Sequence, residues 1–456
     1  VSFPRREPTE QHDRTRLTGD VLVTAPLDST GRNTSTTLVS QLSNHEETDR
    51  ETALSNLATC ARSHERAEDL RQAARDRSSF DVSESTPRSE MVRTDLRVID
   101  LLSSPTGGRI AAPEFDPFYA HSGGYGYVWF RDEATVSRHL LAAGDHLDIE
   151  TTDSLFDSAR FLCERQLPDG TWPHRVWATD GSLAPGWANA TVERGDDSTE
   201  YQADQTAAVT AFLATLLETR RDELNQHLTD EITNTVARAV DSLTADIATN
   251  NLPAPCQNVW EDDVGQFAHT AGTYVDAFAA VARAPVSASL RQRSLEGATQ
   301  VMEGLQNLWD ENRGAYVTKL EQGDGSRDDR IDGAALILAR AFQAYDSLQE
   351  RTLSTRQVDR LAEHISTTLD TLFRNPSESS VAGLMRYEED YWRSNEQGEE
   401  KIWSVTTAMG AIAAARTGSI LNDRGRNGTA YLDRGSDLYE LVASNGPLTT
   451  EAGVIR

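Results

Sequence analysis

Apolar residues recur at intervals of three and four positions along most of the chain after residue 90, which is the spacing of amphipathic helices. Strand-like segments in this region are few and short, so the pattern predicts an all-α domain. About eleven helices fit a solenoid, a bundle or a closed double ring of helix pairs, and no strict solenoid-type repeat is visible. The expected helices cover residues 90–102, 129–143, 151–166, 204–219, 229–248, 267–283, 288–309, 332–347, 355–374, 402–416 and 429–443.

The chain before this domain has a different pattern. Residues 19–24 and 35–40 are short runs rich in β-branched side chains, separated by a Gly-, Asn- and Ser-rich stretch as in a hairpin. We therefore expect residues 1–45 to form a short β segment that cannot be a stable domain alone. Residues 46–89 are strongly charged with helically spaced apolar positions, which predicts a helical linker into a main domain over residues 90–456.

The charge balance excludes two classes of partner. The chain has 72 acidic residues against 44 lysines and arginines, a formal net charge of −28, whereas nucleic acids and anionic membranes call for basic surfaces. The lysines are Lys319 and Lys401, and nearly all cations are therefore arginine. High acidity with so little lysine predicts a halophilic protein, because strong salt screens the self-repulsion of such a charge.

Cysteine usage and the termini add little chemistry. Cys60, Cys163 and Cys256 have no C-x-x-C spacing, so neither a zinc site nor a disulfide framework is expected. The chain has no run of 18 apolar residues and no signal-peptide pattern, which predicts a cytoplasmic protein as the sequence stands and leaves export of a longer precursor open. Because the first residue is Val1, the start is either processed or cut from a longer reading frame.

Candidate chemistry gathers first at residues 258–263, where a tryptophan precedes three acids. If this stretch lines a pocket, the indole of Trp260 raises the pKa of the Glu261 carboxyl by desolvation, and Glu261 can then stay protonated and act as an acid. Under the alternative interpretation, the acids form the favourable first turn of the following helix and Trp260 is a packing residue.

Two further loops carry aromatic and charged residues together. Residues 123–130 place glycines and aromatic rings directly before Arg131 and Asp132, a combination that suits a sugar, which has apolar faces and a rim of hydroxyls. Alternatively, Arg131 and Asp132 only pair with each other and cap a helix. The loop 167–174, which contains Trp172, leads through Trp177 and Trp187 to the polar stretch 201–205. These three tryptophans either bind sugar or simply cover a core.

Taken together, these stretches resemble the glucoamylase family, glycoside hydrolase family 15. The segment 103–113 is similar to the family's entry to the catalytic domain, and residues 129–132 match its Trp-x-Arg-Asp sugar-binding motif. Residues 260–262 match the Trp-Glu-Glu motif of the general acid, with Asp262 in place of the second Glu. The segments 386–390 and 403–407 resemble further motifs of the archaeal and bacterial branch, so the likeness runs in order from about residue 90 to the end.

The resemblance implies an (α/α)6 barrel in which two carboxylates act by inversion, separated by roughly 6.5–9.5 Å. Glu261 takes the role of the acid. The base of the family lies in a late loop, whose nearest equivalent here is residues 446–451, and this makes Glu451 the first candidate, although Thr450 and Ala452 depart from the family pattern. Glu388 is the next candidate, in a loop that also contains Glu389 and Glu400.

The activity implied is an exo-acting glucan 1,4-alpha-glucosidase that releases glucose from non-reducing ends and needs no metal or organic cofactor. Alternatives are a trehalase or α-1,6-glucan hydrolase of the same fold, or a catalytically silent carbohydrate-binding barrel. The resemblance assigns substrate binding to Trp129, Arg131, Asp132, Trp260, Asp262, Arg386 and Tyr387.

The two ends of the chain bear on the expected architecture. The chain stops five residues after Glu451, so we expect an (α/α)6 barrel that lacks its last helix. The short β segment at the start is likewise expected to be the remnant of an N-terminal β-sandwich domain. Either the chain is a fragment or it is an intact descendant that has lost activity. The sequence leaves the oligomeric state open.

Overall fold

The computed structural model describes residues 49–64, 66–76, 80–112, 125–184, 202–261, 263–323, 325–348, 352–375, 381–391, 401–443 and 446–448. The chain divides into two compact units, and the helices α1 (Arg50–Ser63) and α2 (Ala67–Asp76) belong to the first. These two helices lie within the segment 46–89, where a helical linker was expected. The β segment expected over residues 1–45 lies outside the described residues.

The second unit, which holds the described residues from Val82 onward, is built of helices. Each of its described α-helices coincides with one of the segments that the spacing of apolar residues predicts, which confirms the all-α prediction. The helices are α3 (Ser89–Leu102), α4 (Phe130–Leu147), α5 (Thr152–Glu164), α7 (Ala203–Arg220), α8 (Gln226–Ala245), α9 (Ala268–Arg283), α10 (Ala288–Gly304), α11 (Leu338–Asp346), α12 (Thr355–Leu372), α13 (Ser404–Asp423) and α14 (Thr429–Val442).

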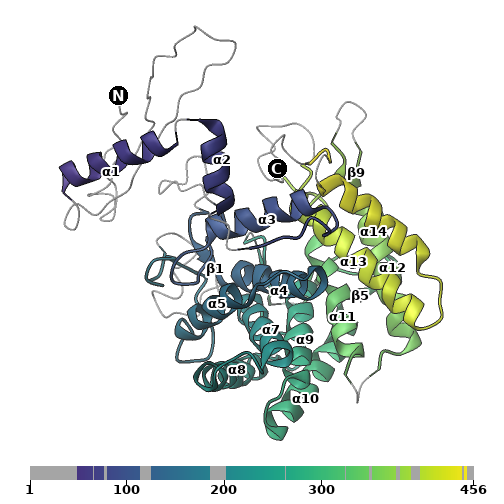
Figure 1. Ribbon diagram of the computed structural model, residues 1–456. Coiled ribbons are helices and arrows are strands. Elements are labelled where there is room, and N and C mark those ends of the chain that lie inside the picture. Colours follow the sequence, from purple (N-terminus) through teal and green to yellow (C-terminus); the bar gives the residue numbers. More distant parts are fainter. Residues whose placement is uncertain are drawn as a thin grey trace, which may run out of the picture. The chain divides into compact units, whose positions relative to one another are not determined.

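These helices alternate between an inner and an outer layer. The inner helices α4, α7, α9, α11 and α13 pack side by side in that order, as Figure 1 shows from blue through teal and green to yellow. Each is followed by an outer helix that packs against it: α5, α8, α10, α12 and α14. This alternation is that of an (α/α)6 barrel. No helix among the described residues fills a sixth inner position, and residues 449–456 lie outside them.

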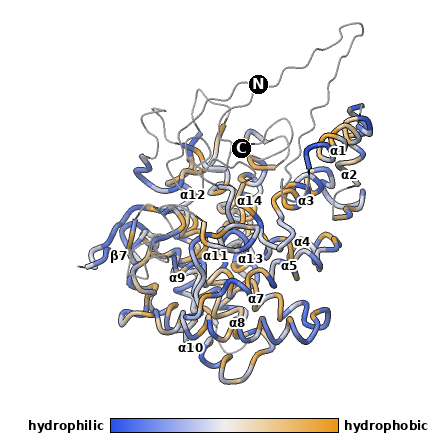
Figure 2. The backbone as a smooth tube through the Cα atoms, turned by 90° about the vertical axis from the view of Figure 1, so that its left-hand side faces the viewer, coloured by the Kyte–Doolittle hydropathy of each residue, from blue (hydrophilic) through white to orange (hydrophobic). Residues whose placement is uncertain are grey.

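The sequence explains which helices are inner. In α9 every residue from Ala268 to Ala282 is buried, because this helix is apolar or small on all sides. The outer helix α10 packs closely on α9, and a Cβ at Gly297 would lie only 2.9 Å from the ring of Phe278. The tubes of α8 and α10 alternate between hydrophobic and hydrophilic stretches in Figure 2, as expected where one face of a helix is buried.

The outer helices α8, α10 and α12 begin with side-chain caps, whereas α5 and α14 do not. Asn225 caps α8, Ser287 caps α10, and Ser354 forms a capping box with Gln357 at the start of α12. Each such cap satisfies a backbone N–H that lacks a partner within the helix and stabilises it by about 1 kcal/mol. These caps fix the residues at which α8, α10 and α12 begin.

Short strands connect the helices at the end where the inner helices begin. The strand β1 (Val128–Trp129) pairs with β2 (Arg175–Val176) and leads directly into α4. A four-stranded antiparallel sheet joins β3 (Cys256–Gln257), β4 (Val264–Phe267), β7 (Lys319–Glu321) and β8 (Arg327–Asp328), and β4 leads directly into α9. Two-stranded ribbons join β5 (Trp309–Asp310) to β6 (Ala315–Tyr316) and β9 (Phe373–Arg374) to β10 (Gly383–Leu384), and the 3-10 helix η4 (Gly333–Ile337) precedes α11.

Candidate active site

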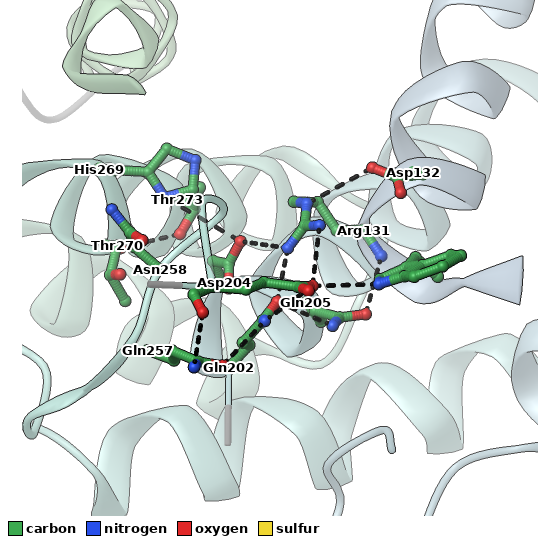
Figure 3. Close-up of polar contacts among 12 residues, drawn as sticks. Arg131, Asp132, Gln202, Asp204, Gln205, Gln257, Asn258, His269, Thr270 and Thr273 are labelled. Carbon is green, nitrogen blue, oxygen red and sulfur yellow. Dashed lines mark hydrogen bonds and ion pairs between the residues drawn. The ribbon is translucent and has the colours of Figure 1, made fainter. Parts of the chain in front are cut away.

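Polar residues from three inner helices meet where those helices begin. The first turn of α4 supplies Arg131 and Asp132, and the start of α7 supplies Gln202, Asp204 and Gln205. Figure 3 shows Arg131 between Asp132 and Asp204, with His269 of α9 beyond Asp204. The antiparallel arrangement of inner and outer helices places all inner N-termini at one end, which is why residues far apart in sequence converge here.

Glu261, the predicted acid, lies in this cluster. Its Oε1 accepts hydrogen bonds from Trp129 Nε1 (3.1 Å) and Gln202 Nε2 (3.1 Å) and lies 2.5 Å from His174 Nε2. A terminal nitrogen of Arg131 is 4.0 Å from the same oxygen. All four contacts reach Oε1, and no hydrogen bond from a described residue reaches Oε2. One oxygen of the carboxylate is thus held firmly while the other remains available.

The electrostatic setting of Glu261 corrects one expectation. Burial alone would raise the pKa of Glu261, but the hydrogen bond and charge of His174 and the charge of Arg131 lower the pKa to about 2. The prediction that Trp260 raises this pKa is therefore wrong. The Trp260 indole donates instead to Asp332 Oδ1 at 2.8 Å. Glu261 considered alone is an ionised carboxylate.

The backbone at Glu261 is unusual and is held in place. Its φ is +61°, in the left-handed region that non-glycine residues rarely adopt. The Glu261 N–H donates to the Asn258 carbonyl (3.1 Å), and Gln257 Nε2 donates to the Glu261 carbonyl (3.1 Å). The alternative interpretation, an acidic first helical turn, is wrong because β4 separates Glu261 from α9, which begins at Ala268.

Arg131 links the cluster together. Its guanidinium donates to Gln202 Oε1 (2.6 Å) and Asp204 Oδ2 (3.4 Å), and its Nε lies 3.4 Å from Asp132 Oδ1. Burial disfavours its charge, yet the charges of Asp132, Asp204 and Glu261 raise the pKa of Arg131 above its ordinary value. Burial also raises the pKa of Asp132, partly against the effect of Arg131. Arg131 and Asp132 do pair, but Arg131 has further partners as well.

Two polar atoms behind Arg131 have no hydrogen-bond partner among the described residues. Asp204 is fully buried and its Oδ1 accepts no hydrogen bond from a described residue. His269 Nδ1 lies 4.0 Å from Asp204 Oδ2 and likewise lacks a hydrogen bond. Burial, together with the charge of Arg131, lowers the pKa of His269 to about 4, so its ring is neutral at pH 7. Buried groups without partners are uncommon and point to a ligand or water that the protein expects.

A second part of the site lies on the other side of Trp260. A pocket of about 140 Å³ is lined by Asn258, Trp260, Asp263, Phe267, Thr318, Arg330, Asp332 and Tyr387. Of the predicted binding residues, Trp260 and Tyr387 therefore face this pocket. Arg386 is buried, pairs with Asp390 through bonds of 2.7 and 2.6 Å, and stacks on Trp260 with its guanidinium carbon 5.5 Å from the ring centre. Arg386 supports this aromatic wall from behind.

Of the candidate bases, Glu388 and Glu389 lie within the described residues. Glu388 Oε2 accepts from an Arg313 nitrogen (2.5 Å) and from the Ile331 N–H (2.7 Å), so this carboxylate is already bound. Glu389 adopts a left-handed φ of +61°. Glu451 and Asp262, like Glu400, lie outside the described residues, and the identity of the base stays a prediction.

Sequence reasoning did not assign roles to His174, Gln202, Asp204, Gln205 or His269. The first four lie in the stretches 167–174 and 201–205, which attracted notice for their tryptophans and polarity. Trp172 proves to be a core residue, 1% exposed, whereas its neighbour His174 reaches Glu261. The sequence signal that could have found His174 is a histidine within a polar loop between two predicted helices.

Within the described ranges, no group of three or more His, Cys, Asp and Glu side chains could hold a metal ion. None of the helices in those ranges is long and apolar enough to cross a membrane.

The layered helices are those of an (α/α)6 barrel, and Glu261 lies beside Arg131 and Trp129 at the end where its inner helices begin. Residues 88–445 match the family model described as glycosyl hydrolases family 15, and the chain belongs to this family. Residues 1–53 match the model of a domain of unknown function.

Relatives agree with this assignment. The chain is 25% identical over 358 residues to an uncharacterized glycosyl hydrolase of Methanocaldococcus jannaschii, covering 76% of this chain and 48% of the relative. The chain thus spans about half the length of the curated relative it matches.

Solved structures show the same fold. A bacterial glucoamylase complexed with acarbose superposes with a TM-score of 0.57 at 15% identity, covering 89% of this chain and 56% of that one. The glucoamylase of Saccharomycopsis fibuligera gives a TM-score of 0.53 at 14% identity, covering 74% of this chain and 75% of that one.

Proposed function

We propose that this protein is an exo-acting, inverting α-glucosidase of the glucoamylase type that releases glucose from non-reducing ends of α-glucans. The observation that supports this most directly is the position of Glu261. Its carboxylate is held by Trp129, His174 and Gln202 beside the Arg131 and Asp132 pair, at the end where the inner helices begin. Family membership supports the same chemistry.

In the proposed reaction, Glu261 gives a proton to the glycosidic oxygen as the bond from that oxygen to the anomeric carbon breaks. Glu451, the candidate base, takes a proton from the water that attacks the anomeric carbon from the opposite face. The product is glucose with inverted configuration. Arg131 and Asp132 bind the hydroxyls of the terminal glucose, because charged groups form the stronger hydrogen bonds to hydroxyls.

The remaining predicted binding residues complete the proposed sugar site. Trp129, Trp260 and Tyr387 offer aromatic faces to the sugar ring, Asp262 accepts from its hydroxyls, and Arg386 holds the aromatic wall in position. The pocket of about 140 Å³ beside Trp260 is smaller than the roughly 300–1,000 Å³ of pockets that enclose a whole drug-sized ligand.

The test is hydrolysis of maltose, isomaltose and trehalose at low and at molar salt, with the anomer of released glucose followed by NMR. We expect β-glucose from maltose, with activity that persists in strong salt because the chain carries a charge of −28. Hydrolysis of trehalose or isomaltose in preference to maltose would instead favour the related hydrolases of the same fold. A folded protein that hydrolyses none of them is the carbohydrate-binding barrel.

The variant Glu261→Gln provides the control for the site. We expect its kcat to fall by roughly 10²–10⁴, the usual contribution of a general acid. The exposed Glu164→Gln, on α5, is the matched variant and should keep full activity. Unchanged turnover in Glu261→Gln would remove Glu261 from the mechanism.

A further inference from the structure

The contact between Glu261 and His174 bears on where the catalytic proton is held, and this inference rests on the proposed function. A general acid must hold a proton near neutral pH, yet Glu261 is surrounded by groups that favour its carboxylate form. His174 is 3% exposed, and its Nε2 lies 2.5 Å from Glu261 Oε1. At that distance the two atoms share a hydrogen.

The orientation of Gln202 constrains that hydrogen. Its Oε1 accepts from Arg131 (2.6 Å) and from Gln205 Nε2 (3.0 Å), so its amide nitrogen must be the end that faces the pair. This Nε2 is 3.1 Å from Glu261 Oε1 and 3.0 Å from His174 Nε2. An amide nitrogen only donates, so Gln202 donates to Glu261 Oε1, and it can donate to His174 Nε2 only when that nitrogen carries no hydrogen.

Two proton positions satisfy this one geometry. With the hydrogen on His174 Nε2, the ring donates to Glu261 Oε1, and Gln202 donates to the same carboxylate. With the hydrogen on Glu261, the carboxyl donates to the single lone pair of His174 Nε2, and Gln202 still donates to Glu261 Oε1. The proton can therefore move between the two side chains without any rearrangement of the heavy atoms.

The groups that face the pair carry both signs of charge. The inner helices present Arg131 and Asp132 from α4, Asp204 from α7 and His269 from α9, and Arg175 follows His174 with its guanidinium carbon 5.2 Å from the centre of the Trp129 ring. His269 is neutral at pH 7 because burial lowers its pKa to about 4. Arg131, 4.0 Å from Glu261 Oε1, favours the carboxylate form of Glu261, so the proton that Glu261 gives away must come from a neighbouring group, and His174 is in direct contact with it.

We propose that His174 and Glu261 form a proton-holding dyad in which His174 is a positioning residue that supplies Glu261 with the proton it gives to the glycosidic oxygen. The Nε2–H bond of His174 breaks as an O–H bond forms on Glu261, and that proton then passes to the leaving oxygen. The protonated Oε1 then reaches the leaving oxygen by rotation about the two-fold terminal torsion of Glu261, which breaks its hydrogen bonds to Trp129 and Gln202. Glu261 is left as a carboxylate, His174 is neutral, and one proton from water recharges the dyad.

The kinetic test uses His174→Gln, whose amide can still donate to Glu261 but cannot hold an ionisable proton. We expect the alkaline limb of the kcat/KM profile to move to lower pH by about one to two units. Activity near neutral pH should fall at least about tenfold, with recovery toward the wild-type rate in acid and little change in KM. Equal loss at every pH would indicate a merely structural role and overturn the proposal. His227→Gln, an exposed histidine on α8, is the matched control.

A second measurement is independent of turnover. Nitrogen NMR of ¹⁵N-histidine protein, with the His174 signals assigned by their loss in His174→Gln, follows protonation of the ring directly. We expect the Nε2 signal of His174 to move in Glu261→Gln, because an amide replaces the carboxylate that shares its hydrogen. An Nε2 signal that stays unchanged would refute the dyad. Wild-type protein that hydrolyses no substrate would count against the proposed function alone, since the NMR comparison still decides the dyad.

Discussion

Two buried arginine–carboxylate centres lie next to each other along α4, and they differ in how fully their polar groups are satisfied. At the first, Glu133 accepts from the Arg109 backbone N–H (2.8 Å) and guanidinium (2.6 Å) and from Ser137 (3.2 Å). Both terminal nitrogens of Arg109 have partners, among them Ser158 and Ser154, whereas its Nε has none among the described residues. At the second, contacts crowd onto one oxygen of Glu261 and leave its other oxygen available.

The difference separates structure from chemistry. A buried ion pair with partners on both oxygens has no capacity left for a ligand, and its role is to fix the loop before α4 against the helices. The centre at Arg131 instead contains Asp204 Oδ1 and His269 Nδ1, which lack hydrogen-bond partners among the described residues. A buried polar atom without a hydrogen-bond partner costs free energy, and such atoms are kept at sites where a bound ligand supplies the missing partner. We therefore expect the two centres to respond to mutation in opposite ways.

The largest effect on stability is expected from Glu133→Ala. This change leaves the guanidinium of Arg109 buried without its carboxylate, which costs about 3–5 kcal/mol. The free energy of unfolding, measured by urea denaturation, should fall by that amount, whereas Glu261→Gln should lower it by at most about 3 kcal/mol near neutral pH. If Glu133→Ala lowered the free energy of unfolding by less than about 1 kcal/mol, the Arg109–Glu133 pair would not be the structural centre that the comparison makes it.

Acid pH gives a second way to sharpen the comparison. The pKa of Glu261 is about 2 in the folded protein against an ordinary value of 4.5, so its carboxylate stabilises the fold above pH 4.5 and this contribution is lost as the pH falls toward 2. The contribution is at most about 3 kcal/mol. Urea denaturation should show the stability difference between wild type and Glu261→Gln shrinking through this pH range. A difference that stays constant from pH 6 to pH 2.5 would contradict the lowered pKa.

Much of the fold was readable from local sequence. The helices of the second unit follow from apolar spacing, as in α12, where Val358, Leu361, Ile365 and Leu369 form the buried face. The motif at residues 129–132 and the glutamate at 261 were recognised as well. These features were accessible because each depends on residues close together in the chain.

The electrostatic character of Glu261 could not be read in the same way. His174 lies 87 residues and Gln202 lies 59 residues before Glu261, and the ring of inner helices alone brings them together. Trp260, the sequence neighbour from which a raised pKa was inferred, turns instead toward Asp332. The pKa is set by neighbours in space, and the direction inferred from the neighbour in sequence was therefore wrong.

The smallest expected effect on stability is that of a change at Asp204, which resembles each of the two centres in one respect. It is as fully buried as Glu133, but its Oδ1 has no partner. Asp204→Asn keeps the shape and removes a charge that was costly to bury, so we expect a stability change below about 1 kcal/mol. Loss of its charge loosens Arg131, and KM and the inhibition constant for glucose should rise several-fold, by about 1 kcal/mol of binding.

The opposite result for Asp204→Asn would place this residue with the structural centre. A loss of 3 kcal/mol or more in unfolding free energy, about the cost of breaking a buried pair, together with an unchanged KM would show that Asp204 holds the helices rather than Arg131. Ser137→Ala is the matched control, because Ser137 contacts Glu133 from the same helix at 3.2 Å. That variant should lower stability by about 1 kcal/mol and leave KM unchanged, since the hydroxyl completes only the satisfied pair.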